Sequence, residues 1–163
     1  MEVSTTSSCP SPRRAYGIAV LGSNVVIHAG WDGSDLFFLS MKDLEWIRFK
    51  DSGKHRHSLT AISDKHILEV GGRFNDSFEL SNSACILDIQ RLIHDPNVKI
   101  QLPPHSLRTI MEPIPSSHFP GGLWNHQAVG VAKESGYAVI CIGGFTNQSR
   151  SNHPNHMLVF DIE

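Results

Sequence analysis

The sequence predicts an all-β protein built from three copies of one short antiparallel unit. Short apolar runs alternate with turn residues, most clearly in residues 57–89, where polar turns separate three such runs. A glycine closes the second run of each copy, and Gly30, Gly72 and Gly144 fall in register. The 42 residues from Gly30 to Gly72 match the ~40 to 50 residues of one propeller blade. The next interval, 72 residues, contains about 30 more than one blade needs.

The composition is that of one soluble globular domain. The chain has 163 residues, of which 40% are hydrophobic and 18% charged. A net charge of −2 provides no general attraction to nucleic acid or to an anionic membrane. No apolar run approaches the ~18 residues of a membrane helix, and the first residues do not resemble a secretory signal. We therefore expect a cytoplasmic or nuclear protein with neither nucleic-acid nor membrane partners.

The first repeat is expected at residues 13–51, after a disordered lead-in at residues 1–12. Its first two strands form a hairpin around Gly22-Ser23-Asn24, which is a favourable turn sequence. Its four strands are expected at residues 16–21, 25–29, 36–39 and 46–49.

The second repeat is expected at residues 52–102, with strands at residues 58–62, 66–70 and 84–89. The best candidate for its outer strand is residues 98–102. The pair Gly71-Gly72 ends the second strand, where the backbone needs positive φ or a close neighbour. Residues 103–122 are rich in proline and serine, so we expect a surface loop inserted between repeats.

The third repeat is expected at residues 123–163, with strands at residues 128–132, 137–142 and 157–162 and no outer strand. Propellers close with ~4 to 8 blades, because closure removes exposed strand edges. Three blades leave two open sides. We therefore expect either a piece of a larger propeller or a chain that self-associates through its open blade edges.

The repeats resemble the kelch family: a polar start, two apolar strands ending in Gly-Gly, a variable loop, a third strand and a tryptophan in the fourth. The sequence departs from the pattern at Ala29-Gly30 and lacks a tryptophan in repeat two at the position of Trp46. Within the family it is similar to the last three blades of the group that includes kelch domain-containing protein 2. That similarity covers most of residues 12–162. It rests on the segments Glu45-Trp46-Ile47-Arg48-Phe49, Arg56-His57-Ser58-Leu59-Thr60, Ser63-Asp64-Lys65-His66, Leu123-Trp124 and Ser151-Asn152-His153.

The resemblance implies a partial kelch-type β-propeller of about three four-stranded blades that binds a protein or peptide. Members of that group are substrate receptors of a cullin ubiquitin ligase and read C-terminal peptide ends. Their carboxylate-binding arginine and serine match Lys54 and Ser81, and lysine lacks the bidentate fork of arginine. Arg13, Arg56 and Trp124 precede first strands and could line the same face. The alternative is a scaffold or cytoskeleton-binding kelch module without a ligase role.

The sequence predicts no enzyme. It contains neither a nucleophile elbow nor a phosphate-binding glycine loop. Its ten histidines include the pairs His55/His57 and His153/His156, but nothing in the sequence brings three or four ligands together. We therefore predict no catalytic residues, no cofactor and no metal ligands. A metalloenzyme remains the third and least favoured class.

Overall fold

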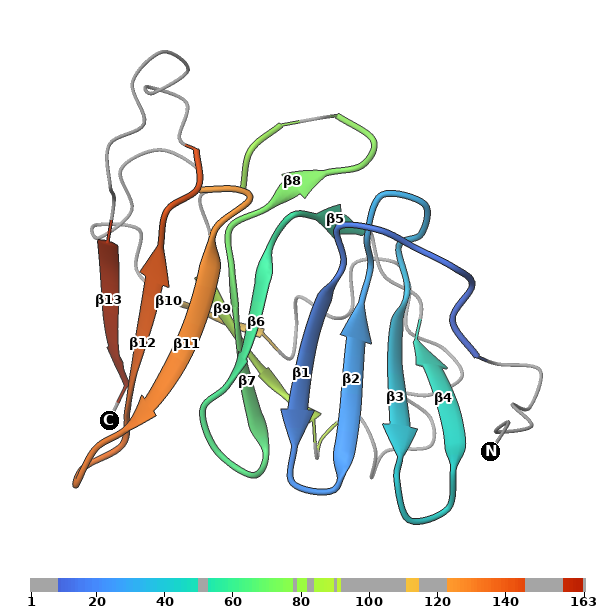
Figure 1. The fold of residues 1–163 in the computed structure, drawn as a ribbon, viewed down its shortest axis with the longest axis horizontal. Coiled ribbons are helices and arrows are strands. Elements are labelled where there is room, and N and C mark those ends of the chain that lie inside the picture. Colours follow the sequence, from blue (N-terminus) through green and yellow to red (C-terminus); the bar gives the residue numbers. More distant parts are fainter. Residues whose placement is uncertain are drawn as a thin grey trace.

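The computed structural model describes residues 9–49, 53–77, 79–81, 84–89, 91, 111–114, 123–145 and 157–162. These residues form an all-β structure of antiparallel sheets, as the sequence predicts. Three larger sheets follow one another along the chain, and a two-stranded ribbon lies at the upper end of the sheets in Figure 1. Most of the predicted lead-in, residues 1–8, and the candidate strand at residues 98–102 lie outside the described residues.

The first sheet confirms all four predicted strands. Its strands pair in chain order and are β1 (Gly17–Leu21), β2 (Asn24–His28), β3 (Leu36–Ser40) and β4 (Glu45–Phe49). Leu21 pairs with Asn24, so Gly22 and Ser23 form the two-residue turn of the first hairpin. Gly22 has a φ of 58°, which glycine adopts without a steric penalty.

The second sheet corrects one prediction. Its strands are β6 (Ser58–Ala61), β7 (His66–Val70), β9 (Ala84–Asp88) and β10 (Met111–Ile114), in the order β10-β9-β7-β6. The fourth strand, β10, comes from the segment that the sequence analysis assigned wholly to a loop. Pro113 conceals this strand in the sequence, because proline donates no hydrogen bond. Proline is tolerated here because β10 lies at the edge of the sheet.

The third sheet contains three strands in the described residues, as predicted: β11 (Gln127–Ala132), β12 (Tyr137–Ile142) and β13 (Met157–Ile162). The short ribbon pairs β5 (Lys54–His55) with β8 (Arg73–Phe74). This ribbon was not predicted, because the first strand of the second repeat was expected to begin at Ser58.

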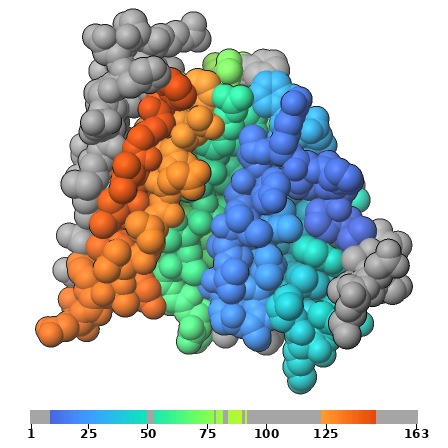
Figure 2. Space-filling view, viewed as in Figure 1, coloured from blue at the N-terminus to red at the C-terminus, as the bar shows by residue number. Residues whose placement is uncertain are grey.

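The three sheets pack face to face, with β6 lying between β1 and β11. Figure 2 shows the three repeats as adjacent blue, green and orange bands. Each contact between sheets has an apolar core. The first contains Ala19, Leu21, Val26, Leu36, Phe38, Phe49, Leu59, Ile67, Leu87 and Ile89. The second contains Ile62, Leu68, Val70, Ala84, Leu123, Val139 and Cys141. The middle sheet therefore buries apolar side chains on both of its faces.

The same backbone hydrogen bond joins each repeat to the next. Just before the first strand of each sheet stands a residue with positive φ: Ala15 (56°), Arg56 (59°) and Asn125 (60°). The Arg56 N–H donates to the Ala15 carbonyl at 2.7 Å, and the Asn125 N–H donates to the Arg56 carbonyl at 2.9 Å. A recurrent left-handed residue thus links the repeats at one end of the sheets.

A second recurrent bond starts from the glycine that closes each second strand. The Gly30 N–H donates to the Lys54 carbonyl at 2.9 Å, and the Gly72 N–H donates to the Leu123 carbonyl at 2.7 Å. Gly71 and Gly72 have φ of 62° and 92°, which confirms the positive φ expected of this pair, and Gly144 has a φ of 86°.

Gly71→Ala should lower the free energy of unfolding by roughly 2 to 3 kcal/mol. Its φ is 62°, and an added Cβ would lie 2.0 Å from the Leu123 carbonyl oxygen. The control is Gly22→Ala, with a φ of 58° and no atom within 4 Å of the added Cβ. It should cost only about 1 kcal/mol. Urea denaturation measures both, and equal losses would show that the contact with Leu123 contributes nothing.

Candidate functional site

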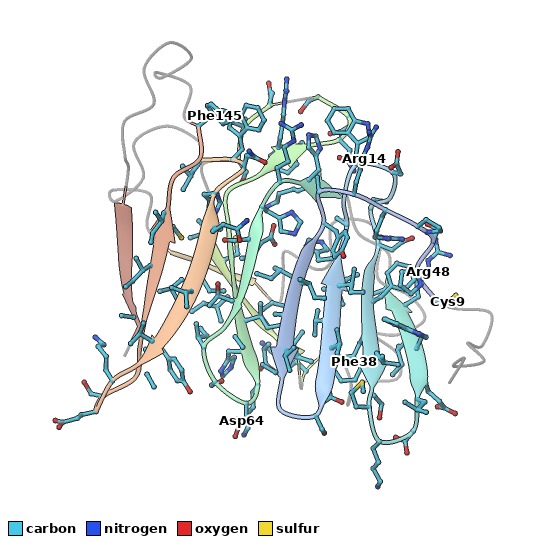
Figure 3. The ribbon with its side chains drawn as sticks, viewed as in Figure 1. Cys9, Arg14, Phe38, Arg48, Asp64 and Phe145 are labelled. Atoms are coloured by element: carbon cyan, nitrogen blue, oxygen red, sulfur yellow. The ribbon has the colours of Figure 1, made fainter. Side chains whose placement is uncertain are left out.

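Side chains from all three repeats gather at the end of the sheets where the recurrent bonds lie. Figure 3 labels Arg14 and Phe145 at this end and Asp64 at the opposite end. Five of the side chains form a row of ring and guanidinium contacts, which we call the arginine–tryptophan ladder. Its members are Arg14, Trp31, Arg56, Trp124 and Arg73.

The ladder alternates cations with aromatic rings. The Arg14 and Arg56 guanidinium carbons lie 5.6 and 5.9 Å from the centre of the Trp31 ring. Arg56 also lies 4.8 Å from the Trp124 ring, which Arg73 approaches to 5.9 Å. Arg56 therefore stands between two tryptophans that come from different repeats. Contacts of this kind hold a guanidinium in place without neutralising its charge.

Trp31 packs against His55, which in turn contacts Asn75. The His55 ring lies 4.4 Å from the Trp31 ring, and its Nδ1 is 2.7 Å from Asn75 Oδ1. The Asn75 amide in turn donates to the Gly30 carbonyl at 2.9 Å. Burial lowers the pKa of His55, and nearby Arg56 lowers it further against the opposing hydrogen bond from Asn75. A neutral His55 therefore supports the ladder.

The ladder is rich in positive charge. Arg14 lies 3.8 Å from Asp32, but both side chains are more than half exposed, so water screens this pair. Arg56 has no carboxylate partner within the described part of the chain. The planar guanidinium of Arg56 can therefore accept an external carboxylate through two parallel hydrogen bonds.

A buried polar cluster lies between the first and second sheets and consists of Lys54, Glu69, His28 and His57. Lys54 Nζ lies 2.7 Å from Glu69 Oε1, and His28 Nδ1 lies 3.9 Å from Glu69 Oε2. The His28 and His57 rings pack edge to face with centroids 4.9 Å apart. Glu69 is only 1% exposed, so its charge depends on these neighbours.

The electrostatics of the cluster favour a charged Glu69 and a neutral His57. Burial raises the pKa of Glu69, but Lys54, His28 and His57 outweigh it and lower that pKa to about 2. Burial lowers the pKa of His57 to about 3, despite the opposing attraction of Glu69. At neutral pH the cluster therefore contains one ion pair beside a neutral imidazole.

A related histidine lies between the second and third sheets. His126 Nε2 is 2.8 Å from Ser58 Oγ, and burial lowers the pKa of His126 to about 4. His57 and His126 follow the left-handed residues of their repeats. A Cβ added at Gly72 would lie 2.7 Å from His57 Cβ, and a Cβ added at Gly144 would lie 2.8 Å from His126 Cβ. These glycines therefore also make room for the two histidines.

The structure separates the five residues that the sequence analysis proposed for peptide binding. Arg56 and Trp124 meet in the ladder. Lys54 and Ser81 also meet, at 3.5 Å, but Lys54 turns inward to Glu69. The Lys54 ammonium is thus paired inside the protein, where its charge offsets that of the buried Glu69 carboxylate.

Arg13 does not join the ladder. Its guanidinium donates to the Ala29 carbonyl at 3.0 Å and lies 4.6 Å from the centre of the Phe37 ring. Burial lowers its pKa, against the opposing attraction of Asp35. Arg13 therefore packs against the first sheet.

Three members of the ladder and three buried polar residues were not predicted from the sequence. The ladder members Arg14, Trp31 and Arg73 adjoin the recurrent positive-φ positions, which was the available signal. Glu69 shares a strand face with the apolar Ile67, so the period of two predicts its burial. His28 precedes Ala29-Gly30 at the end of β2, and His126 precedes β11, but nothing in the sequence identifies their partners.

Three residues of the buried cluster also form a candidate metal-ligand set. Ligand atoms of His28, His57 and Glu69 all lie within 4.8 Å of one another. Zinc binds nitrogen and oxygen ligands at ~2.0 to 2.2 Å, so the ligands would have to move closer together. Lys54 already provides Glu69 with a cation. In this conformation Glu69 is therefore paired with the Lys54 ammonium group.

No protein-family model and no curated protein matches this chain. The described residues contain no helix that is long and apolar enough to span a membrane. The geometry of the ladder and the repetition of the sheets therefore provide the basis for a function.

Proposed function

We propose that the three sheets are kelch-type blades of a partial β-propeller and that the chain acts by binding a protein partner. The recurrent bonds at the left-handed residues and closing glycines support one repeated unit. The first strand of the second sheet, β6, packs between the first strands of the other two sheets, β1 and β11. This contact supports an arrangement in which neighbouring blades meet along their first strands. Loops that gather at one end of such an arrangement form its usual binding surface.

The ligand that fits the arginine–tryptophan ladder is a peptide with a free C-terminal carboxylate. The observation that carries this proposal is Arg56, which stands between Trp31 and Trp124 without a carboxylate partner in the described residues. A peptide end offers the planar, two-oxygen anion that a guanidinium binds best. Trp31, which is 39% exposed, can contact the apolar side chains that precede this carboxylate.

Arg56 takes the role that the sequence resemblance gives to Lys54. The Lys54 ammonium is paired with Glu69 and lies 3.5 Å from Ser81 Oγ. The ribbon places Lys54 next to His55, which contacts Trp31. Lys54 therefore acts as a positioning residue. In the cell, this activity would be that of a substrate receptor for a cullin-RING ubiquitin ligase in the cytoplasm or nucleus.

Arg56→Gln should weaken peptide binding about 10- to 100-fold, because it removes charge-assisted hydrogen bonds. The measurement is fluorescence anisotropy with a pool of labelled random peptides whose C-termini are either free or amidated. The unsubstituted protein should prefer the free peptides by a similar factor.

The control is Arg91→Gln, which removes an exposed arginine that follows β9. It should bind as the unsubstituted protein does. Equal binding of free and amidated peptides would contradict the proposal and favour a scaffold module that does not read peptide ends.

A further inference from the structure

The two outer faces of the stacked sheets expose apolar side chains. On β1, Ile18 and Val20 are 51% and 64% exposed, and they point away from the second sheet; we call this the leading face. On the third sheet, Val129, Val131 and Ile142 are 52%, 44% and 56% exposed, and we call this the trailing face. A contiguous group of exposed apolar side chains often marks a surface that binds another protein.

The leading face occupies positions that are covered in the other repeats. Counted from the left-handed residue, Ile18 and Val20 match Leu59 and Ala61 of the second repeat. Leu59 is buried against the first sheet, and Ala61 packs against the same core. In the third repeat, Ala128 matches Ile18 and packs against the second core. In the second and third repeats, the surface equivalent to the leading face thus packs against the preceding repeat.

The trailing face occupies positions that, in the earlier repeats, are covered by the following repeat. Val129 and Val131 match Ala19 and Leu21, which are buried against the second sheet. Ile142 precedes its closing glycine pair as Val70 does, and Val70 is buried in the second core. The trailing face is thus the surface that every earlier repeat turns toward the following one.

The backbone offers the same complementarity. Each contact between repeats uses a glycine N–H and a left-handed carbonyl from the earlier repeat. The Gly144 N–H and the Asn125 carbonyl hold these positions at the trailing face, and no backbone bond occupies them within the described residues. At the leading face, the matching Arg13 carbonyl and Ala15 N–H are likewise unbonded there. The donors and acceptors of the two faces therefore match each other.

A ring contact repeats between neighbours as well. Trp31 of the first repeat contacts His55 of the second at 4.4 Å. At the matching positions, Arg73 of the second repeat contacts Trp124 of the third at 5.9 Å. The next pair in this series is Phe145 with Arg14 of another copy. An aromatic ring facing a guanidinium is again a favourable pair.

We propose that the trailing face of one chain binds the leading face of a second copy. Two copies joined head to tail at both pairs of faces place six sheets in one ring, within the ~4 to 8 of closed propellers. Such a ring has twofold symmetry, and its two new contacts are identical. The proposal rests on the packing of the sheets and is independent of peptide binding.

The first test is the mass of the full chain by light scattering over a range of concentrations. We expect a β-rich species with twice the chain mass of 18.1 kDa. A monomer at every concentration up to about 100 μM, well above common interface affinities, would overturn the proposal. Growth beyond two copies would overturn closure into a ring.

Substitutions then locate the contact. Inside the chain, Gly130 lies against Thr60, with an added Cβ 3.1 Å from Thr60 Cγ2. The matching pair between copies is Val20 with Val129. Val129→Asp or Val20→Lys should raise the dissociation constant of the pair at least about 100-fold, because each buries a lone charge.

The double variant Val20→Lys/Val129→Asp should recover much of the association, because opposite charges then face each other. The control is Met41→Asp, since Met41 is 49% exposed in the turn between β3 and β4, outside both faces. It should leave the mass unchanged. Circular dichroism shows whether each variant remains folded. Folded Val129→Asp that associates as tightly as Met41→Asp would overturn the assigned faces. Arg56→Gln should keep the paired mass, which separates this test from that of peptide binding.

Discussion

Lys54→Met should lower the free energy of unfolding by about 3 to 5 kcal/mol, because it leaves the buried Glu69 charge without its cation. Lys54 Nζ lies 2.7 Å from Glu69 Oε1, and the Glu69 side chain is inaccessible to solvent. Methionine has a similar length and keeps the apolar contacts of the lysine stem. Urea denaturation at pH 7, followed by tryptophan fluorescence, measures the loss.

The double variant Lys54→Met/Glu69→Leu tests the cause. Removing both charges together should restore stability to within about 2 kcal/mol of the unsubstituted protein, because apolar replacements of a buried pair are often neutral. The difference between the single and double variants isolates the interaction. If the double variant is as unstable as Lys54→Met, the loss comes from packing rather than from charge.

The strands were largely predictable because they follow local rules. Short apolar runs bounded by Gly, Ser and Asp predicted β7 with the bounds that the structure shows, and predicted most other strands to within a residue. The closing glycines were predictable for the same reason, since positive φ is a local property. The arrangement of repeats followed from the spacing of those glycines.

The outer strand β10 was not predictable from local rules. Its partner β9 ends at Asp88, so 22 residues separate the two strands in the sequence. Pro113 also argued against a strand, although a sheet edge tolerates proline. Pairing over such a distance depends on tertiary contacts rather than on turn chemistry.

The site was predictable only in part, because its contacts join different repeats. Arg56 and Trp124 were proposed together and lie together. Lys54 was predicted to bind a ligand because its partner, Glu69, lies on another strand. The sequence shows that both residues are charged but not that they form a pair. The contact of Trp31 with Arg56 depends on the packing of two sheets, which no spacing within one repeat reveals.

Acidification from pH 6.5 to pH 4 should unfold the protein, with a loss of stability that approaches about 3 kcal/mol per pH unit near pH 5. Burial lowers the pKa of His57 from 6.5 to about 3 and that of His126 from 6.5 to about 4. Below pH 6.5 each of these two histidines therefore binds a proton in the unfolded chain that it does not bind in the folded chain. The contribution of the two neutral histidines to stability is fully present above pH 6.5, and it is lost as the pH falls toward their pKa values in the folded protein. Glu69 acts in the same direction at lower pH, between 4.5 and about 2.

His57→Gln and His126→Gln should each reduce this slope by about 1.4 kcal/mol per pH unit. Each variant lacks one histidine that binds a proton in the unfolded chain but not in the folded chain. The double variant should remove both contributions. The measurement is the free energy of unfolding from urea titrations between pH 4.5 and 7. Arg91→Gln, which does not titrate in this range, should keep the slope of the unsubstituted protein. An unchanged slope in both single variants would mean that the two imidazoles take up protons in the folded protein, and that the spaces beside Gly72 and Gly144 admit the charge.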